Sequence, residues 1–386
     1  MTTHHLSNRS WVFIILLCLA LIYPPFIIAR TISGETFMKG DCYYYRAVIV
    51  SLVEDGDLRL ENNVPDPLIG QLAVGQEGFV PLHSILMPLV SMPFYLLFGT
   101  PGLLLFNILD CMILIVLIFK LNSLFFSRII AFSTTILYAT GTLLLDYTYN
   151  YSPDVFSTVL LLAGLYLVLR GKYYWGAIPL GLSIFAKIPN APLVGVILLY
   201  AVFITWKGDG TNRSIKDDFR KKFTITSITA FIFIVANAPF AYSNYLFFGS
   251  PIVTGYQRMA VAGADGQAVI VDHVNMFNEP LLKGIYQVLF DIGNGTLLTN
   301  PVLILAFAGI FWIKKVKAQD KMYLILVIGL IQFIMIAKYD AWSTSHFSNR
   351  FLMAFIVLSS VFTSNFFSYL SHRYSLEDSI PSLDGS

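Results

Sequence analysis

The chain has 386 residues, of which 56% are hydrophobic and only 12% are charged, and its formal net charge is +2. Soluble domains carry about 25% charged residues, so this composition excludes an ordinary soluble protein and indicates one that is solvated mainly by lipid. The three cysteines imply no disulfide framework.

Hydropathy predicts about ten transmembrane helices, each close to the length that crosses a bilayer core. In chain order they lie at 11–29, 102–119, 128–145, 154–170, 174–187, 191–206, 223–245, 301–313, 322–339 and 351–370. The first is longer than the apolar core of a signal peptide and lacks a small-residue cleavage site, so we expect an uncleaved anchor. The expected fold class is therefore an all-α polytopic membrane protein.

The apolar segment 84–98 decides the topology. It is short for a span and contains Pro88 and Pro93, so we interpret it as a helix that lies along the outer interface. With the N-terminus inside, most of the 25 basic residues then fall in short inner loops, as the positive-inside rule requires. Both termini are predicted to be cytoplasmic, with 371–386 as a polar tail.

The predicted outer face carries the polar segments of a single transmembrane domain, 1–370. These segments are the first outer loop with its interfacial helices (30–101), a second outer loop (249–299) and the short loop 340–350. The sequence contains no Walker lysine loop, dinucleotide glycine fingerprint or zinc-ligand spacing. Nucleotide-activated substrates are normally absent outside the cytoplasm, so a donor used there is expected to be lipid-linked.

Asp41 lies near the start of the first outer loop, among the aromatic residues of the segment 37–45. An ionised carboxylate within hydrogen-bond reach of an acceptor hydroxyl can act as a general base. Aspartate is also a favoured N-cap, so Asp41 could instead cap a helix that begins at Cys42.

Several short segments resemble the C-type glycosyltransferase superfamily, in the branch similar to protein O-mannosyltransferases and aminoarabinose transferases (glycosyltransferase families 39 and 83). Gly40-Asp41 followed by Tyr44 is similar to the first outer loop of that family. Residues 81–99 resemble the juxtamembrane helix that precedes its second span. The other matching segments, which with these cover most of the chain, are 51–58, Asn62-Asn63, 244–251, 254–256, 289–301 and 342–351.

The resemblance implies a catalytic role for Asp41. In this family an acid of the first outer loop acts as general base in an inverting transfer from a polyprenyl-phosphate sugar. Many relatives follow this aspartate with glutamate, whereas Cys42 follows it here. The paired acid is thus missing, and this weakens the case for a metal at this position. No metal site or cofactor is predicted, and a divalent metal is not excluded.

A second acid, Asp154, occupies a position where family members often have an acid that faces the same cavity. Pro153 and Asp154 equally suit the first turn of a helix, where proline is tolerated and a carboxylate complements the helix dipole. The only charge assigned to mid-membrane depth is Asp110, for which we expect a structural polar contact.

Lys187 and Arg350 are the candidate ligands of the donor phosphate. Both lie at the outer ends of spans, against the inside bias of the basic residues, and family members often carry cations there. A guanidinium can bind phosphate through two parallel hydrogen bonds. The alternative is that both side chains extend to lipid headgroups. The other possible substrate contacts are Tyr44, His83, Tyr256, Trp342 and His346, all of which could instead be passive interfacial residues.

The sequence therefore predicts a hexosyl- or pentosyltransferase of the plasma or inner membrane, acting in the cell envelope with an extracytoplasmic active site. The expected partners are a polyprenyl-phosphate-linked sugar donor, a lipid, glycan or protein acceptor and membrane lipids, but no nucleic acid. The alternatives are a transporter or flippase of lipid-linked glycans, which favours internal repeats and midplane charges, or a non-catalytic subunit with the same fold.

Overall fold

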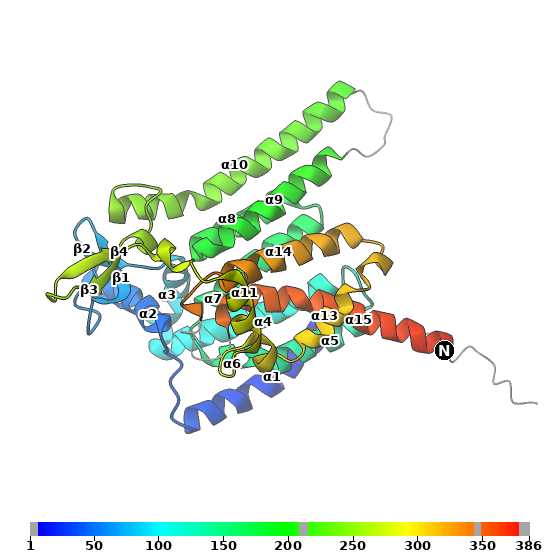
Figure 1. The fold of residues 1–386 in the computed structure, drawn as a ribbon, viewed down its shortest axis with the longest axis horizontal. Coiled ribbons are helices and arrows are strands. Elements are labelled where there is room, and N and C mark those ends of the chain that lie inside the picture. Colours follow the sequence, from blue (N-terminus) through cyan, green and yellow to red (C-terminus); the bar gives the residue numbers. More distant parts are fainter. Residues whose placement is uncertain (1–6, 208–214, 343–348, 378–386) are drawn as a thin grey trace, which may run out of the picture.

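The structure is a computed structural model that describes residues 7–207, 215–342 and 349–377. Long helices form a bundle, and short helices and a small sheet gather at one end of it (Figure 1). The longer helices are α1 (Asn8–Ile32), α2 (Asp41–Val50), α3 (Leu86–Phe98), α4 (Thr100–Asn122), α5 (Arg128–Gly141), α7 (Pro153–Leu169), α8 (Tyr173–Ala186), α9 (Ala191–Trp206), α10 (Ile215–Phe248), α11 (Leu281–Phe290), α13 (Leu303–Ile310), α14 (Gln319–Ala337) and α15 (Met353–Glu377).

Shorter elements connect them. The single-turn helices are α6 (Leu143–Asp146), α12 (Thr296–Thr299), the π-helix η1 (Ser51–Asp55) and the 3-10 helices η2 (Tyr147–Tyr149), η3 (Ile188–Asn190), η4 (Gly255–Gln257), η5 (His273–Met276), η6 (Ile313–Lys315) and η8 (Arg350–Leu352). The strands are β1 (Ile69–Gly75), β2 (Gly78–Pro81), β3 (Met259–Ala262) and β4 (Ala268–Val271).

The chain is an integral membrane protein. In the described part of the chain, six helices are long and apolar enough to cross a bilayer: Asn8–Ile32, Thr100–Asn122, Ile188–Trp206, Asp217–Phe248, Gln319–Ala337 and Arg350–Arg373. A seventh span results if Arg128–Gly141 and Leu143–Tyr149, which meet at 61°, are counted as one. Each of the ten predicted segments contains a helix, but α7, α8 and α13 are shorter than a full crossing. The segment 84–98 is helical as α3, and its interfacial position stays a prediction.

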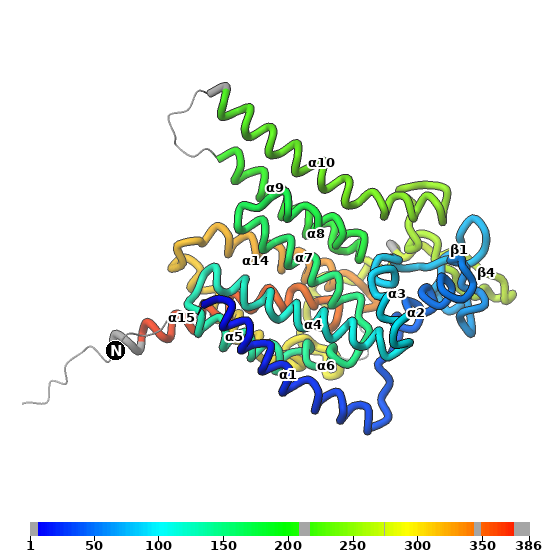
Figure 2. The backbone as a smooth tube through the Cα atoms, turned by 180° about the vertical axis from the view of Figure 1, so that it is seen from behind, coloured from blue at the N-terminus to red at the C-terminus, as the bar shows by residue number. Residues whose placement is uncertain are grey.

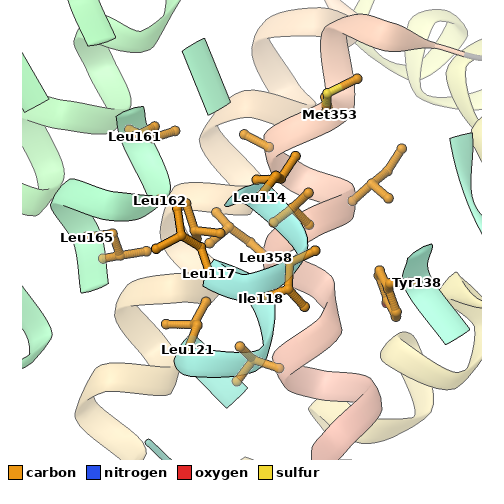
Figure 3. Packing of buried hydrophobic residues seen from close by; sticks show 14 of the residues in the cluster. Leu114, Leu117, Ile118, Leu121, Tyr138, Leu161, Leu162, Leu165, Met353 and Leu358 are labelled. Atoms are coloured by element: carbon orange, nitrogen blue, oxygen red, sulfur yellow. The ribbon is translucent and has the colours of Figure 1, made fainter. Parts of the chain in front are cut away.

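The core of the bundle lies where α4, α7 and α15 meet, around Leu114, Leu162 and Leu358 (Figure 3). Helix α15 also carries small polar residues on this buried side. Asn122 of α4 donates to the Ser360 hydroxyl at 3.0 Å and accepts from Ser364 at 2.7 Å. Small and hydroxyl residues let helices approach closely and hydrogen-bond across the contact where apolar lipid provides no hydrophobic drive.

The expected structural contact of Asp110 is not seen. Its Oδ2 atom is buried without a hydrogen-bond partner, and neighbouring Asn107 instead donates to the Tyr147 carbonyl at 2.8 Å and accepts from the Ser152 amide at 3.0 Å.

Helices α8, α9 and α10 form one side of the bundle, and both views place α10 along its edge (Figure 2). On another side, the end of α1 is held by ion pairs. Arg30 contacts Glu35 at 2.6 Å and also pairs with Asp146 of α6, while Lys39 contacts Glu35 at 3.0 Å. These contacts fix the chain where it leaves α1 and enters the first outer loop.

The two outer loops are joined by a four-stranded antiparallel sheet of order β2-β1-β3-β4. Strand β1 of the first loop pairs with β3 of the second, with Ala73 opposite Met259. Helices were expected in the first loop, and α2 and α3 are present there. The strands were not predicted. The sheet holds η4 and η5 against the end of the bundle, which places part of the second loop beside α2.

Candidate functional site

A cavity of about 420 Å³ lies between the ends of the bundle helices and the two outer loops. Its wall is formed by residues of α2, α7, η3, η4, η5, α14 and η8. Segments from most of the chain length therefore contribute to it. Six of the nine predicted site residues are in its wall: Asp41, His83, Asp154, Lys187, Tyr256 and Arg350.

Two carboxylates and two cations form a charged cluster in this wall, here called the charge quartet (Asp41, Asp154, Lys187 and Arg350). Arg350 Nη2 donates to Asp41 Oδ2 at 2.7 Å, and Arg350 Nε lies 3.8 Å from Asp154 Oδ2. Lys187 pairs with Asp154 Oδ1. No side chain of the quartet is more than 18% exposed. Its formal charge is zero, which allows four ionised groups to stay at the edge of a membrane protein.

Each quartet member lies at the end of a helix. Asp154, Lys187 and Arg350 lie at the ends of apolar helices, whereas Asp41 begins a short helix of the first outer loop. Asp41 is the first residue of α2, and the N-cap is Gly40, whose φ of 54° favours glycine. The helix therefore begins at Asp41 rather than Cys42, and the Asp41 carboxylate faces Arg350 instead of capping a backbone amide.

The other three members are placed in the same way. Asp154 is in the first turn of α7, whose N-cap is Ser152, so it complements the helix dipole and also faces the cavity. Lys187 directly follows the last residue of α8 and has an extended backbone. Arg350 is the first residue of η8, which directly precedes α15.

The electrostatics of the cavity keep Asp41 ionised. Burial by itself raises the pKa of Asp41, but the charges of Arg350, His83 and Lys187 and the hydrogen bond from Arg350 outweigh burial and hold this pKa below its ordinary value. Burial raises the pKa of the adjacent Cys42 thiol to about 12, and this thiol donates to Asn150 Oδ1 at 2.8 Å. Cys42 is thus a neutral thiol and does not replace the second acid found in relatives.

Two histidines of the cavity wall each lie within hydrogen-bond distance of a tyrosine hydroxyl. His83 Nδ1 is 3.2 Å from the Tyr256 hydroxyl, and its ring stacks on Tyr45 at 5.5 Å. His273 Nε2 is 2.9 Å from the Tyr339 hydroxyl. The remaining ring nitrogens, His83 Nε2 and His273 Nδ1, are buried without a hydrogen-bond partner.

Both imidazoles are neutral at physiological pH. Burial lowers the pKa of His83 to about 4 and also lowers that of His273. Each imidazole therefore keeps one unpartnered nitrogen that can donate or accept a hydrogen bond, depending on the tautomer.

Two predicted residues lie elsewhere. Tyr44 contributes to a separate small pocket, and Trp342 is buried at the edge of the main apolar core. His346 lies outside the described residues. Among the residues that the structure describes, no group of three or more His, Cys, Asp or Glu side chains could hold a metal ion.

His273 and Tyr339 were not predicted as cavity residues, and Tyr45 was named only among the aromatic residues near Asp41. Tyr45 follows Asp41 by four positions, so it shares a helix face with Asp41, and the helical period could have favoured it over Tyr44. No comparable signal existed for His273, since the sheet brings it to the cavity.

No protein-family model matches the chain, and no curated protein matches it at the sequence level. Solved structures do resemble it in fold. ArnT from Cupriavidus metallidurans bound to undecaprenyl phosphate superposes with a TM-score of 0.60 at 13% identity, over 96% of this chain and 62% of that one.

The oligosaccharyltransferase of Archaeoglobus fulgidus gives a TM-score of 0.58 in its apo form, at 13% identity, over 98% of this chain and 53% of its own. Its complex with an inhibitory peptide and a dolichol-phosphate gives 0.54 at 12% identity over the same shares. The chain thus spans less than two thirds of the length of these proteins. Since the likeness to both structures covers nearly all of this chain, the protein shares the fold of these two transferases.

Proposed function

We propose that the protein is a membrane glycosyltransferase that transfers a sugar from a polyprenyl-phosphate donor to an acceptor on the extracytoplasmic face. The charge quartet carries this proposal: two carboxylates and two cations from four distant segments converge in one cavity at the end of the bundle. The fold supports it, because solved structures with this fold contain undecaprenyl phosphate or a dolichol-phosphate.

In the proposed reaction Lys187 and Arg350 bind the donor phosphate. Asp41 accepts the proton of the acceptor hydroxyl, and the acceptor oxygen attacks the anomeric carbon. The bond between that carbon and the phosphate oxygen breaks, so the polyprenyl phosphate leaves and the configuration inverts. The two cations stabilise the charge that develops on the departing phosphate.

The charge balance of the cavity favours a neutral acceptor group. The four quartet members are the only Asp, Glu, Lys or Arg residues among the described residues that line the cavity, and their charges cancel. A donor phosphodiester brings the total to −1, and a phosphate acceptor would place further negative charge in a largely buried site. We therefore propose a hydroxyl acceptor on a lipid or glycan, with His83 and His273 hydrogen-bonding hydroxyl groups of the substrates.

The test compares glycolipid profiles of cells with and without the gene, because the species that disappears or accumulates identifies donor and acceptor together. The gene is then restored as wild type, Asp41→Asn or Glu54→Gln. Glu54 is an exposed acid of the same loop and serves as the matched control. Wild type and the control are expected to restore the profile, and Asp41→Asn is not.

Two results would overturn the proposal. One is full restoration by Asp41→Asn at wild-type protein level. The other is a glycolipid profile that does not depend on the gene, which would favour a non-catalytic subunit.

A further inference from the structure

A second cavity, of about 750 Å³, lies far from the candidate site. It is bordered by the segment after α4, by η6 and the residues that follow it, and by the last turns of α15. Helix α15 begins beside the charge quartet, and its residues that line this cavity follow 12 to 20 positions after Met353, which is about 18 to 30 Å along the helix axis. The far edge of the cavity is thus about one hydrocarbon-core thickness from the charge quartet, which places the cavity toward the opposite membrane interface and the lipid headgroups there.

The wall of this cavity is basic. Lys315, Lys317 and Arg373 contribute to it together with His372, and no acidic residue is among the described residues that line it. The lining of the first cavity differs, because it contains two carboxylates beside its two cations. A site with this charge is suited to an anion, and a bilayer presents phosphate groups at this depth.

Aromatic rings form a fixed wall beside these cations. Trp312 stacks on Tyr369, with ring centroids 4.2 Å apart and 15° between the planes. Lys315 Nζ lies 4.7 Å from the centroid of the same Tyr369 ring. The stack and the cation–π contact restrain the Lys315 side chain, which is therefore partly ordered at the cavity before any ligand binds.

We propose that this second cavity binds the phosphate headgroup of an anionic phospholipid, with Lys315 and Lys317 contacting the phosphate. The rings of Trp312 and Tyr369 lie at the boundary where the headgroup meets the acyl chains, which is where amphipathic rings are favoured in membranes. Basic pockets between membrane helices bind such headgroups through the same chemistry. The site is independent of the transferase proposal, since it shares no residue with the first cavity.

The experiment measures lipid binding to the purified full-length protein, by native mass spectrometry and by the rise in unfolding temperature. The probes are phosphatidylglycerol, phosphatidylcholine and inorganic phosphate. The pocket variant is Lys315→Gln/Lys317→Gln. The control is Lys207→Gln/Lys221→Gln, which removes the same charge from exposed lysines beside the α9–α10 connection.

Phosphatidylglycerol is expected to bind and stabilise the wild type and the control equally. The pocket variant is expected to bind it about thirtyfold more weakly, since each lysine near an anionic headgroup contributes about 1 kcal/mol. Equal weakening in the control would overturn the proposal, because it would show a general surface-charge effect. Equal stabilisation by phosphatidylcholine, or full reproduction of the effect by inorganic phosphate, would also overturn it.

Should the pocket variant not fold, photocrosslinking of the wild type provides the test. A phosphatidylglycerol with a photoreactive headgroup is expected to label peptides that contain 312–318 and 365–373. Labelling spread evenly over the basic loops would refute the assignment.

Discussion

Replacing Arg350 with glutamine should change how the stability of the protein depends on pH. Arg350 donates to Asp41 at 2.7 Å and lies 3.8 Å from Asp154, and both carboxylates are largely buried. A hydrogen bond between charged groups contributes about 1.5 to 3 kcal/mol, and one pKa unit corresponds to about 1.4 kcal/mol. Loss of Arg350 should therefore raise the pKa of Asp41, because the unfavourable effect of burial on the carboxylate is then less well compensated.

The direction of the effect follows from linkage. In the wild type the pKa of folded Asp41 lies below its ordinary value of 3.8, so Asp41 stabilises the fold above that value and this contribution is lost as the pH falls through the folded pKa. In Arg350→Gln the pKa of Asp41 in the folded protein is expected to lie above its pKa in the unfolded chain. Asp41 then destabilises the fold at neutral pH, and the defect shrinks as acid protonates the carboxyl.

The assay is thermal unfolding of the purified protein between about pH 4 and pH 8. The defect of Arg350→Gln relative to wild type is expected to grow by about 1.5 to 3 kcal/mol across this range. Asp41→Asn/Arg350→Gln is expected to recover part of the loss at neutral pH. The control, Arg46→Gln, removes a cation of the same helix as Asp41 that hydrogen-bonds Thr100, and its effect should not vary with pH. A defect of equal size at every pH, or no recovery in the double variant, would refute this reasoning.

Two further predictions concern packing at other places in the bundle. Gly309→Ala should cost about 2 kcal/mol or more, because a Cβ there would overlap the Phe362 carbonyl oxygen of α15; Gly195→Ala, whose Cβ meets open space, should be neutral or stabilising. Thermal unfolding of both variants checks this, and equal losses would contradict it. Asp146→Asn should lower stability by about 1 kcal/mol by weakening the contact with Arg30, and limited proteolysis of the segment after α1 should become faster; unchanged cleavage would argue against the role given to this ion pair.

Much of the fold could be predicted from the sequence because of one physical constraint. Backbone polar groups have no water to bind in a bilayer core, so a long apolar segment must satisfy them locally as a helix. The positions of Asp154, Lys187 and Arg350 follow from the same constraint, because a charge next to an apolar run marks the point where a helix leaves the lipid. Asp41 carries no such signal. Its place among aromatic residues at the start of the first outer loop made it a candidate base, and the resemblance to a known family implied its catalytic role.

Only the tertiary structure showed how these residues combine. Asp41 and Arg350 are 309 positions apart, and their contact depends on how α2 and α15 pack. The sheet was missed because β1 and β3 each satisfy their backbone groups on the other, and no local pattern in either segment reveals a partner nearly 190 residues away. That pairing brings His273 and Tyr256 to the cavity, so the neutral half of the candidate site is a consequence of long-range strand pairing, whereas three of the four charged residues are marked by the ends of the apolar segments.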